Sequence, residues 1–218
     1  MSAGDFAVDL IAPPVSDYLD RLVPERPAVL HEMEVLARKL DFPIIGPACG
    51  WFCYQVARMG GTKRVFELGS GFGYSTAWFA RAVEENGGGE VHHTVWDEKL
   101  SRQARKYLGE LGYRRTVHYH VREAVEALRA SAGGFDLIFM DIDKEGYPAA
   151  LPVIREKLHA GGVLIVDNLL WSGRIFDADD RTPATEGVRE LTRMVTADPG
   201  WIASIVPIRD GLLLAWRR

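Results

Sequence analysis

Glycine occupies every second position in part of the segment Glu67-Leu68-Gly69-Ser70-Gly71-Phe72-Gly73-Tyr74-Ser75. The segment follows an apolar run over residues 64–68 that is typical of a buried strand, and it leads into a helical pattern over residues 75–83. Glycines allow a sharp turn and a close approach of the backbone to a ligand, while the helix N-terminus presents free N–H groups. Three alternating glycines after an acidic residue therefore indicate a binding site for a nucleotide-type ligand. Their spacing differs from the Gly-x-Gly-x-x-Gly of dinucleotide-binding proteins.

Apolar runs and helical patterns alternate beyond this turn. Strands are predicted at residues 90–96, 116–120, 135–140 and 162–166, and helices at 98–111, 123–130 and 146–158. This alternation predicts βαβ units and a parallel sheet with helices on both faces. The chain ends differently, because predicted strands at 201–207 and 212–216 flank Asp210-Gly211, which is a signal for an antiparallel hairpin.

The first 60 residues are predicted to be helical and carry several prolines. Amphipathic helices are predicted after Pro13-Pro14 and over residues 27–40, and a shorter helix over 51–59 follows the interruptions at Pro43 and Pro47. This region forms either a cap or an oligomer face. No internal repeat separates it from the rest, so residues 1–218 are predicted to form one domain, with 1–60 as its N-terminal helical region.

The composition is that of an ordinary globular protein. The 218 residues are 47% hydrophobic and 26% charged, with a formal net charge of −4. The mild acidity argues against a nucleic-acid partner. No apolar run approaches the roughly 20 residues that span a bilayer, and no basic region precedes an apolar N-terminal stretch, so a cytoplasmic location without membrane partners is the default expectation. The two cysteines, Cys49 and Cys53, are expected to be buried thiols without a metal or redox role.

Polar side chains follow the strands predicted at 135–140 and 162–166. Asp141 and Lys144 come after the first, and Asp167 and Asn168 after the second. Because neighbouring parallel strands end at one ligand crevice, we expect these side chains to converge. Hard oxygen donors suit Mg²⁺, with Ca²⁺ or Mn²⁺ as alternatives. Such a cation would bind two adjacent substrate hydroxyls and lower the pKa of one, with Lys144 accepting its proton. Each residue alone is more often a cap, a turn former or a solvated charge.

Two of these segments resemble a known family. Residues 65–75 resemble motif I of class I S-adenosylmethionine-dependent methyltransferases. Asp-x-Asp-Lys-x-x-Tyr at 141–147, followed by Gly-Gly-x-x-x-x-Asp-Asn-x-x-Trp-x-Gly at 161–173, resembles the signature of the metal-dependent caffeoyl-CoA and catechol O-methyltransferases. The resemblance extends from about residue 45 to residue 215. It implies a Rossmann-like α/β fold with a mostly parallel seven-stranded sheet and an antiparallel C-terminal hairpin.

The same resemblance implies the roles of individual residues. S-adenosylmethionine would be the methyl donor, with Glu67, Gly69 and Ser75 around its methionine part. Asp141, Asp167 and Asn168 would be the metal ligands, and Asp141 and Lys144 the catalytic residues, with Lys144 as the base. The full set expected to bind the cofactor is Glu67, Gly69, Ser70, Gly71, Gly73, Ser75, Asp97, Glu123, Ala124 and Asp141.

The chain departs from the family pattern at three positions. Val95 stands where the family has the carboxylate that binds the ribose, so either Asp97 takes over this role or it caps the following helix. Glu123 stands in Arg122-Glu123-Ala124 where the family has Gly-Asp-Ala; it either accepts from the adenine amino group or is a helix first-turn acid. Thr192 stands where the family often has asparagine near the acceptor, which argues against a caffeoyl-CoA substrate.

These patterns together predict methyl transfer to a hydroxyl of a small, catechol-like aromatic acceptor. Tyr147 and Trp171 are candidates for an aromatic pocket, and the amphipathic N-terminal helices favour a homodimer. A nicotinamide-dependent oxidoreductase is the first alternative, which the glycine spacing and the hairpin oppose. A catalytically lapsed cofactor-binding protein is the second; Val95 supports it, and the retained strand-end residues oppose it.

Overall fold

The computed structural model describes residues 12–218, and its sheet has the strand order β3-β2-β1-β4-β5-β7-β6. The strands are β1 (Arg64–Leu68), β2 (Glu90–Thr94), β3 (Val117–His120), β4 (Phe135–Met140), β5 (Leu158–Val166), β6 (Trp201–Val206) and β7 (Leu212–Arg217). Strands β1 to β5 pair in parallel, whereas β7 is antiparallel to both β5 and β6. The predicted seven-stranded, mostly parallel sheet with an antiparallel C-terminal hairpin is confirmed.

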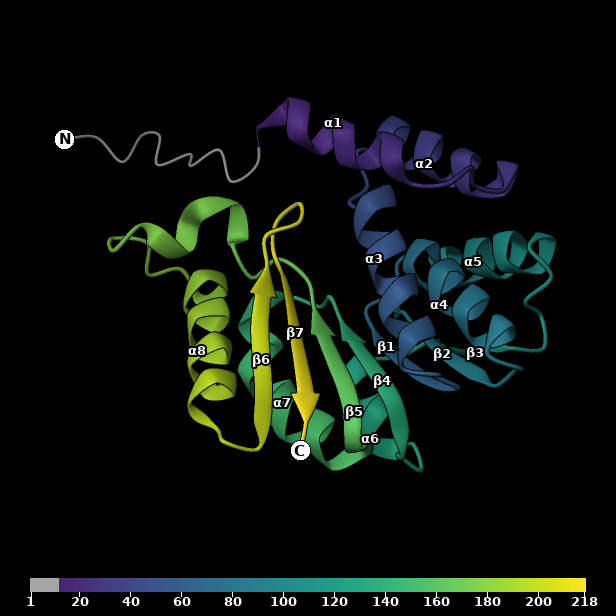
Figure 1. Cartoon of the computed structure of the whole chain (residues 1–218). Coiled ribbons are helices and arrows are strands. Elements are labelled where there is room, and N and C mark those ends of the chain that lie inside the picture. Colours follow the sequence, from purple (N-terminus) through teal and green to yellow (C-terminus); the bar gives the residue numbers. More distant parts are fainter. Residues whose placement is uncertain (1–11) are drawn as a thin grey trace.

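Helices cover both faces of this sheet (Figure 1). They are α1 (Pro13–Leu22), α2 (Ala28–Leu40), α3 (Gly46–Met59), α4 (Tyr74–Glu85), α5 (Glu98–Glu110), α6 (Ala124–Ala130), α7 (Tyr147–Lys157) and α8 (Pro183–Ala197). Alternate residues of a strand point to opposite faces, so Val65 packs in a core with α3, α4 and α5. Its neighbour Phe66 packs in a second core with α6, α7 and α8.

Several element boundaries differ from the predicted ones. Pro47 was expected to interrupt the chain, but it lies in the first turn of α3, where a missing N–H costs no hydrogen bond. Strand β2 ends at Thr94 instead of Trp96, and β5 begins at Leu158 instead of residue 162. Helix α8 was not predicted at all, and two 3₁₀ helices, η1 (Lys144–Gly146) and η2 (Trp171–Phe176), follow β4 and β5.

The N-terminal helices lie above the carboxyl edge of the parallel strands, toward which β4 and β5 point in Figure 1. Helix α2 is tied to the glycine turn through Glu34, which is buried and accepts hydrogen bonds from Arg26 Nε at 2.8 Å and from Tyr74 Oη at 2.8 Å. Phe42, just after α2, packs on Phe72 with 5.0 Å between ring centroids. The N-terminal region therefore forms one wall of the ligand crevice.

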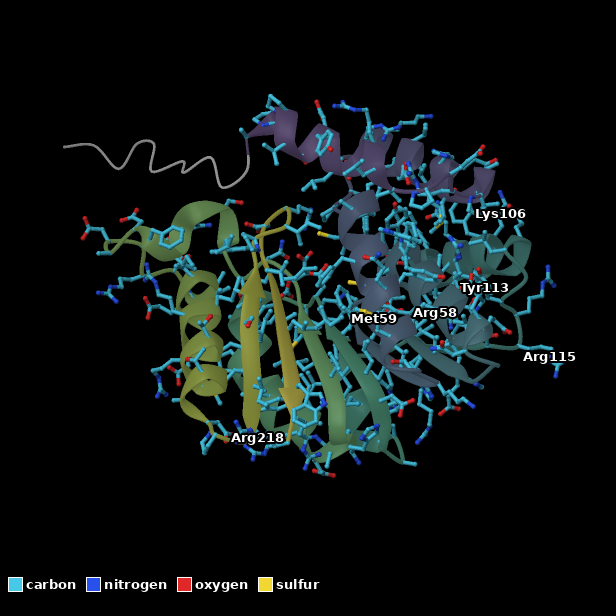
Figure 2. The ribbon with its side chains drawn as sticks, viewed as in Figure 1. Arg58, Met59, Lys106, Tyr113, Arg115 and Arg218 are labelled. Atoms are coloured by element: carbon cyan, nitrogen blue, oxygen red, sulfur yellow. The ribbon has the colours of Figure 1, made fainter. Side chains whose placement is uncertain are left out.

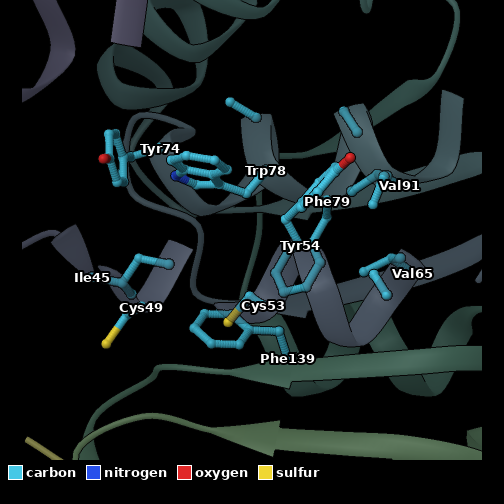
Figure 3. Packing of buried hydrophobic residues seen from close by; sticks show 14 of the residues in the cluster. Ile45, Cys49, Cys53, Tyr54, Val65, Tyr74, Trp78, Phe79, Val91 and Phe139 are labelled. Atoms are coloured by element: carbon cyan, nitrogen blue, oxygen red, sulfur yellow. The ribbon is translucent and has the colours of Figure 1, made fainter. Parts of the chain in front are cut away.

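Both cysteines are buried thiols, as predicted. Figure 3 shows Cys53 packed with Phe139 and Tyr54. Burial raises the pKa of Cys49 to about 12, so its thiol stays protonated. In residues 12–218 no helix is both long enough and apolar enough to cross a membrane. Charged side chains such as Lys106, Arg115 and Arg218 point outward at the periphery (Figure 2).

Candidate active site

A cavity of about 800 Å³ opens at the carboxyl ends of β1, β2 and β4. This volume lies in the range of small-molecule and cofactor sites. The residues of the expected cofactor set that line it are Gly69, Ser70, Gly71, Ser75, Glu123, Ala124 and Asp141. Lys144 lines it as well, whereas Glu67, Gly73 and Asp97 are not among the residues that line it. The structure therefore brings most of the predicted cofactor residues together.

The glycines of the turn are required by backbone geometry. Gly69 has φ +85°, and a Cβ there would lie 2.2 Å from the backbone oxygen of Asp141. Gly71 has φ +48°, and a Cβ would lie 2.9 Å from the ring of Phe42. A larger residue would therefore strain the turn and displace either the β4 end or the N-terminal wall. Gly73 precedes α4 without a side-chain cap, which leaves the helix N-terminus open toward the cavity.

Glu67 is a buried carboxylate at the end of β1. Its Oε1 accepts a hydrogen bond from Ser75 Oγ at 2.6 Å, while its Oε2 has no partner among the described residues. Burial raises the pKa of Glu67 to about 7, although the hydrogen bond from Ser75 opposes the shift. A buried acceptor with a free oxygen beside the glycine turn fits the ammonium group of S-adenosylmethionine.

The ribose position is different from the family pattern. Val95 is buried and lines the cavity, and Trp96 beside it is exposed. Because β2 ends at Thr94, Asp97 does not extend the strand face; it caps α5 by accepting hydrogen bonds from the N–H groups of Lys99 at 2.6 Å and Leu100 at 3.4 Å. Of its two interpretations, the structure shows the helix cap, and its ribose contact stays a prediction.

Glu123 also acts as a helix cap. Both of its carboxylate oxygens accept hydrogen bonds from backbone N–H groups of α6, at 2.9 Å from Val125 and 2.6 Å from Glu126. Its side chain nevertheless lines the cavity next to Ala124. The contact with an adenine amino group remains a prediction, because the carboxylate is already occupied by the helix.

Lys144 stands between an acidic group and two aromatic rings. Its Nζ donates to Asp141 Oδ1 at 2.7 Å and lies 5.2 Å from the ring centroid of Tyr147 and 5.7 Å from that of Trp171. The lysine side chain is only 10% exposed. Tyr147 is fully buried and donates to the backbone oxygen of Asp167 at 3.0 Å, so it ties α7 to the end of β5. Neither Tyr147 nor Trp171 lines the cavity, so both rings pack around the ammonium and the aromatic pocket for the acceptor stays a prediction.

Asp167 is paired with an arginine that the sequence did not single out. Its Oδ2 lies 2.9 Å from Arg209 Nη1 in the β6–β7 turn, and its Oδ1 accepts the N–H of Asn168 at 2.8 Å. Burial raises the pKa of Asp167 to about 6, while the Arg209 guanidinium opposes the shift. The sequence offers no signal for this pair, because residues 167 and 209 are joined only by the sheet topology.

The three predicted metal ligands lie at the ends of adjacent strands, but each already has a protein partner. Asp141 is paired with Lys144 and Asp167 with Arg209, and Asn168 Nδ2 donates to Asp210 Oδ2 at 3.0 Å. No cluster of three or more His, Cys, Asp or Glu residues that could hold a metal occurs in residues 12–218. With two cations on the carboxylates, the arrangement does not fit a divalent ion unless both side chains move.

Thr192, by contrast, takes no part in the cavity. Its hydroxyl donates to the backbone oxygen of Val188 within α8 at 2.8 Å. The cavity wall includes four aromatic residues outside the predicted set, Phe42, Phe72, Tyr74 and Trp96. Phe72 and Tyr74 belong to the glycine-rich segment, whereas no motif marks Phe42 and Trp96, since only the fold brings residues 42 and 96 to the glycine turn.

Residues 24–218 match the profile of a protein family described as O-methyltransferase. The chain belongs to this O-methyltransferase family. A protein of Niastella koreensis named catechol O-methyltransferase is 29% identical over 180 residues, which cover 78% of this chain and 80% of the relative.

Solved structures agree with this assignment. The O-methyltransferase TomG of Streptomyces achromogenes, involved in tomaymycin synthesis and solved in complex with SAM, is 26% identical with a TM-score of 0.84, covering 94% of this chain and 96% of that one. An O-methyltransferase of Bacillus cereus in complex with SAH shares the fold, at 24% identity and a TM-score of 0.85, with 94% and 97% coverage. The protein is an S-adenosylmethionine-dependent O-methyltransferase.

Proposed function

We propose that this O-methyltransferase transfers the methyl group to a hydroxyl of a small, catechol-like aromatic acceptor that binds beside Asp141 and Lys144. The observation that carries this proposal is the position of the Asp141–Lys144 pair, which lines the cofactor cavity at the side facing the β5 end. A hydroxyl bound there would lie between the donor and the strand-end acids. The named catechol O-methyltransferase of Niastella koreensis supports the acceptor class.

The donor end of the cavity is the glycine turn with Glu67. S-adenosylmethionine supplies an electrophilic methyl group on a sulfonium sulfur. Glu67 Oε2 offers a free acceptor for the amino group, and Gly69 and Gly71 line the cavity with their backbone. These contacts would fix the methyl group so that it points toward Asp141 and Lys144.

The reaction is an in-line displacement. The acceptor oxygen forms a bond to the methyl carbon while the carbon–sulfur bond breaks, and its electron pair stays on sulfur as a thioether. The hydroxyl proton passes to the Lys144–Asp141 pair, with Lys144 as the base when its amine is neutral. Tyr147 and Trp171 surround Nζ, so the aromatic rings hold the lysine in the position where it meets the hydroxyl.

A metal-assisted form of the same reaction is the second candidate. It is favoured by the convergence of Asp141, Asp167 and Asn168 at neighbouring strand ends, whose oxygens suit Mg²⁺, with Ca²⁺ or Mn²⁺ as alternatives. The ion pairs of Lys144 and Arg209 oppose it, since both cations would have to leave the carboxylates. Bound metal would supply an acidic centre that lowers the pKa of the hydroxyl.

We further propose that the protein acts as a homodimer through α1. This helix buries none of its residues, and Val15, Tyr18 and Leu22 lie along one side of it with exposed fractions of 49%, 55% and 59%. An apolar helix stripe of this kind is suited to a second copy of the same stripe, because isologous contacts bury both at once.

Substitution of Lys144 tests the proposed reaction. Lys144→Met should lower the kcat for methyl transfer to catechol by about 100-fold or more, because the base is lost, while the Kd for S-adenosylmethionine changes little. Turnover is measured by mass spectrometry of S-adenosylhomocysteine, and binding by calorimetry. Lys99→Met, at an exposed position of α5, is the matched control. Tight NAD binding by the wild type would instead indicate an oxidoreductase, and cofactor binding without turnover on a phenol panel a lapsed enzyme.

A further inference from the structure

Arg209 occupies the centre of the strand-end acids. Its guanidinium lies 2.9 Å from Asp167, which is 1% exposed, and the arginine side chain itself is 35% exposed. A guanidinium stays protonated in proteins, so Arg209 is a permanent cation beside Asp167, one of the residues that a divalent ion would need.

The backbone at Arg209 is also unusual. Its φ is +52°, in the left-handed region that non-glycine residues avoid at a cost of about 1 kcal/mol. The turn is closed by the hydrogen bond from Gly211 N to Ile208 O at 2.9 Å, so the conformation is fixed by the hairpin. A glycine at position 209 would adopt this backbone conformation without strain, yet the chain has an arginine there. Such strain points to a function for the side chain.

We propose that Arg209 holds the acceptor oxygen in place of a divalent cation, and that the enzyme transfers methyl groups without bound metal; this rests on the proposed function. Within residues 12–218 the Arg209 side chain makes no hydrogen bond besides that to Asp167, so its remaining N–H groups are free to bind an oxygen. They stabilise the negative charge that develops as the hydroxyl proton leaves for the Lys144–Asp141 pair. The methyl carbon then gains its bond to oxygen as the bond to sulfur breaks.

This arrangement also predicts the acceptor class. A metal ion selects a vicinal diol because it chelates two oxygens at once, whereas a guanidinium fixed on one side by Asp167 needs only one oxygen. Simple phenols should therefore be methylated about as well as catechols, within roughly tenfold in kcat/KM.

Manganese binding tests the proposal directly. Arg209→Gly relaxes the turn and uncovers Asp167, so it should bind Mn²⁺ at least about tenfold more tightly than the wild type, measured by the electron paramagnetic resonance of free Mn²⁺. Arg209→Asn, which also tolerates positive φ, serves if the glycine variant unfolds. Arg181→Gly, which removes an exposed arginine, should leave Mn²⁺ binding unchanged.

Turnover provides the second readout. Excess EDTA should leave wild-type turnover unchanged, while Arg209→Gly should lose about 100-fold and regain part of it with Mn²⁺. Wild-type Mn²⁺ binding as tight as that of Arg209→Gly, or loss of wild-type turnover in EDTA, would overturn the proposal. If the wild type methylates no acceptor at all, the proposed function fails, and the Mn²⁺ titration alone still decides what Arg209 does.

Discussion

Burial controls the protonation of Glu67, the acid that ends β1. Its carboxyl group is fully buried, and among residues 12–218 Ser75 is the donor that lies at hydrogen-bonding distance, 2.6 Å from Oε1. The folded state therefore holds the proton more tightly than the unfolded chain does, since burial raises the pKa from 4.5 to about 7. Stability contributed by this group is greatest below pH 4.5 and is lost as the pH rises toward 7.

Glu67→Gln should remove this pH dependence. Between pH 4.5 and pH 8 the wild type should lose about 3 kcal/mol of unfolding free energy relative to the variant. Urea unfolding at both pH values measures the shift, and taking the difference cancels the titration of other groups such as Asp167. Glu98→Gln, at an exposed position, is the control. A difference that does not change with pH would mean that Glu67 is ionised throughout.

The positions of residues were predicted best where a local motif lies at the end of a strand. The glycine turn and the strand-end residues Asp141, Asp167 and Asn168 lie where the sequence placed them, because the ends of parallel strands coincide by topology. Arg209 directly precedes Asp210-Gly211, a pair that indicates only a hairpin turn. Nothing in residues 207–211 reveals that its side chain reaches Asp167, since this depends on the antiparallel pairing of β7 with β5.

The contact between helix α8 and the 3₁₀ helix η1 holds Lys144 in place. Gly187 of α8 packs against η1, and a Cβ at this glycine would lie 2.2 Å from the backbone oxygen of Lys144. Gly187 is buried, and the atoms nearest to such a Cβ belong to the backbone of Lys144 and Glu145, which cannot move aside as a flexible side chain could. Helix α8 therefore determines the position of Lys144 relative to Asp141, although no α8 residue lines the cavity.

Gly187→Ala should push η1 away and misplace Lys144. We expect kcat to fall by about tenfold or more and the unfolding free energy to fall by about 1–3 kcal/mol, with little change in the Kd for S-adenosylmethionine. Steady-state kinetics and calorimetry measure the two effects. Gly60→Ala is the matched control, because its Cβ would meet only ordinary contacts at 3.4 Å. Unchanged kcat in Gly187→Ala would show that α8 does not position the base.

Elements were predicted with uneven success for physical reasons. Strand β4 was placed at its observed bounds because its apolar run is clearly bounded. Strand β5 begins four residues earlier than expected, since Leu158 pairs with Phe135 of β4 before a register shift that leads to the pairing of Val163 with Leu137. Helix α8 was missed although its apolar residues, such as Val188 and Leu191, recur at helical spacing.

The proposed homodimer depends on the surface that helix α1 presents on the whole molecule. Helix α1 lies at the top edge of the fold in Figure 1, above α3. Its contacts within the chain are with α3, and its stripe of Val15, Tyr18 and Leu22 remains exposed. A second copy covering this stripe would also hold the N-terminal wall of the cavity in place, which links assembly to cofactor binding.

Leu22→Glu should therefore convert the proposed dimer to monomers, because it places a charge within the apolar stripe. Light scattering after size exclusion should show the mass halved, and the Kd for S-adenosylmethionine should rise as the wall loosens. Asp17→Lys, on the opposite side of α1, changes the charge without touching the stripe and should keep the wild-type mass. A wild-type protein that already runs as a 24.3 kDa monomer would contradict the dimer, and would leave the stripe to some other contact.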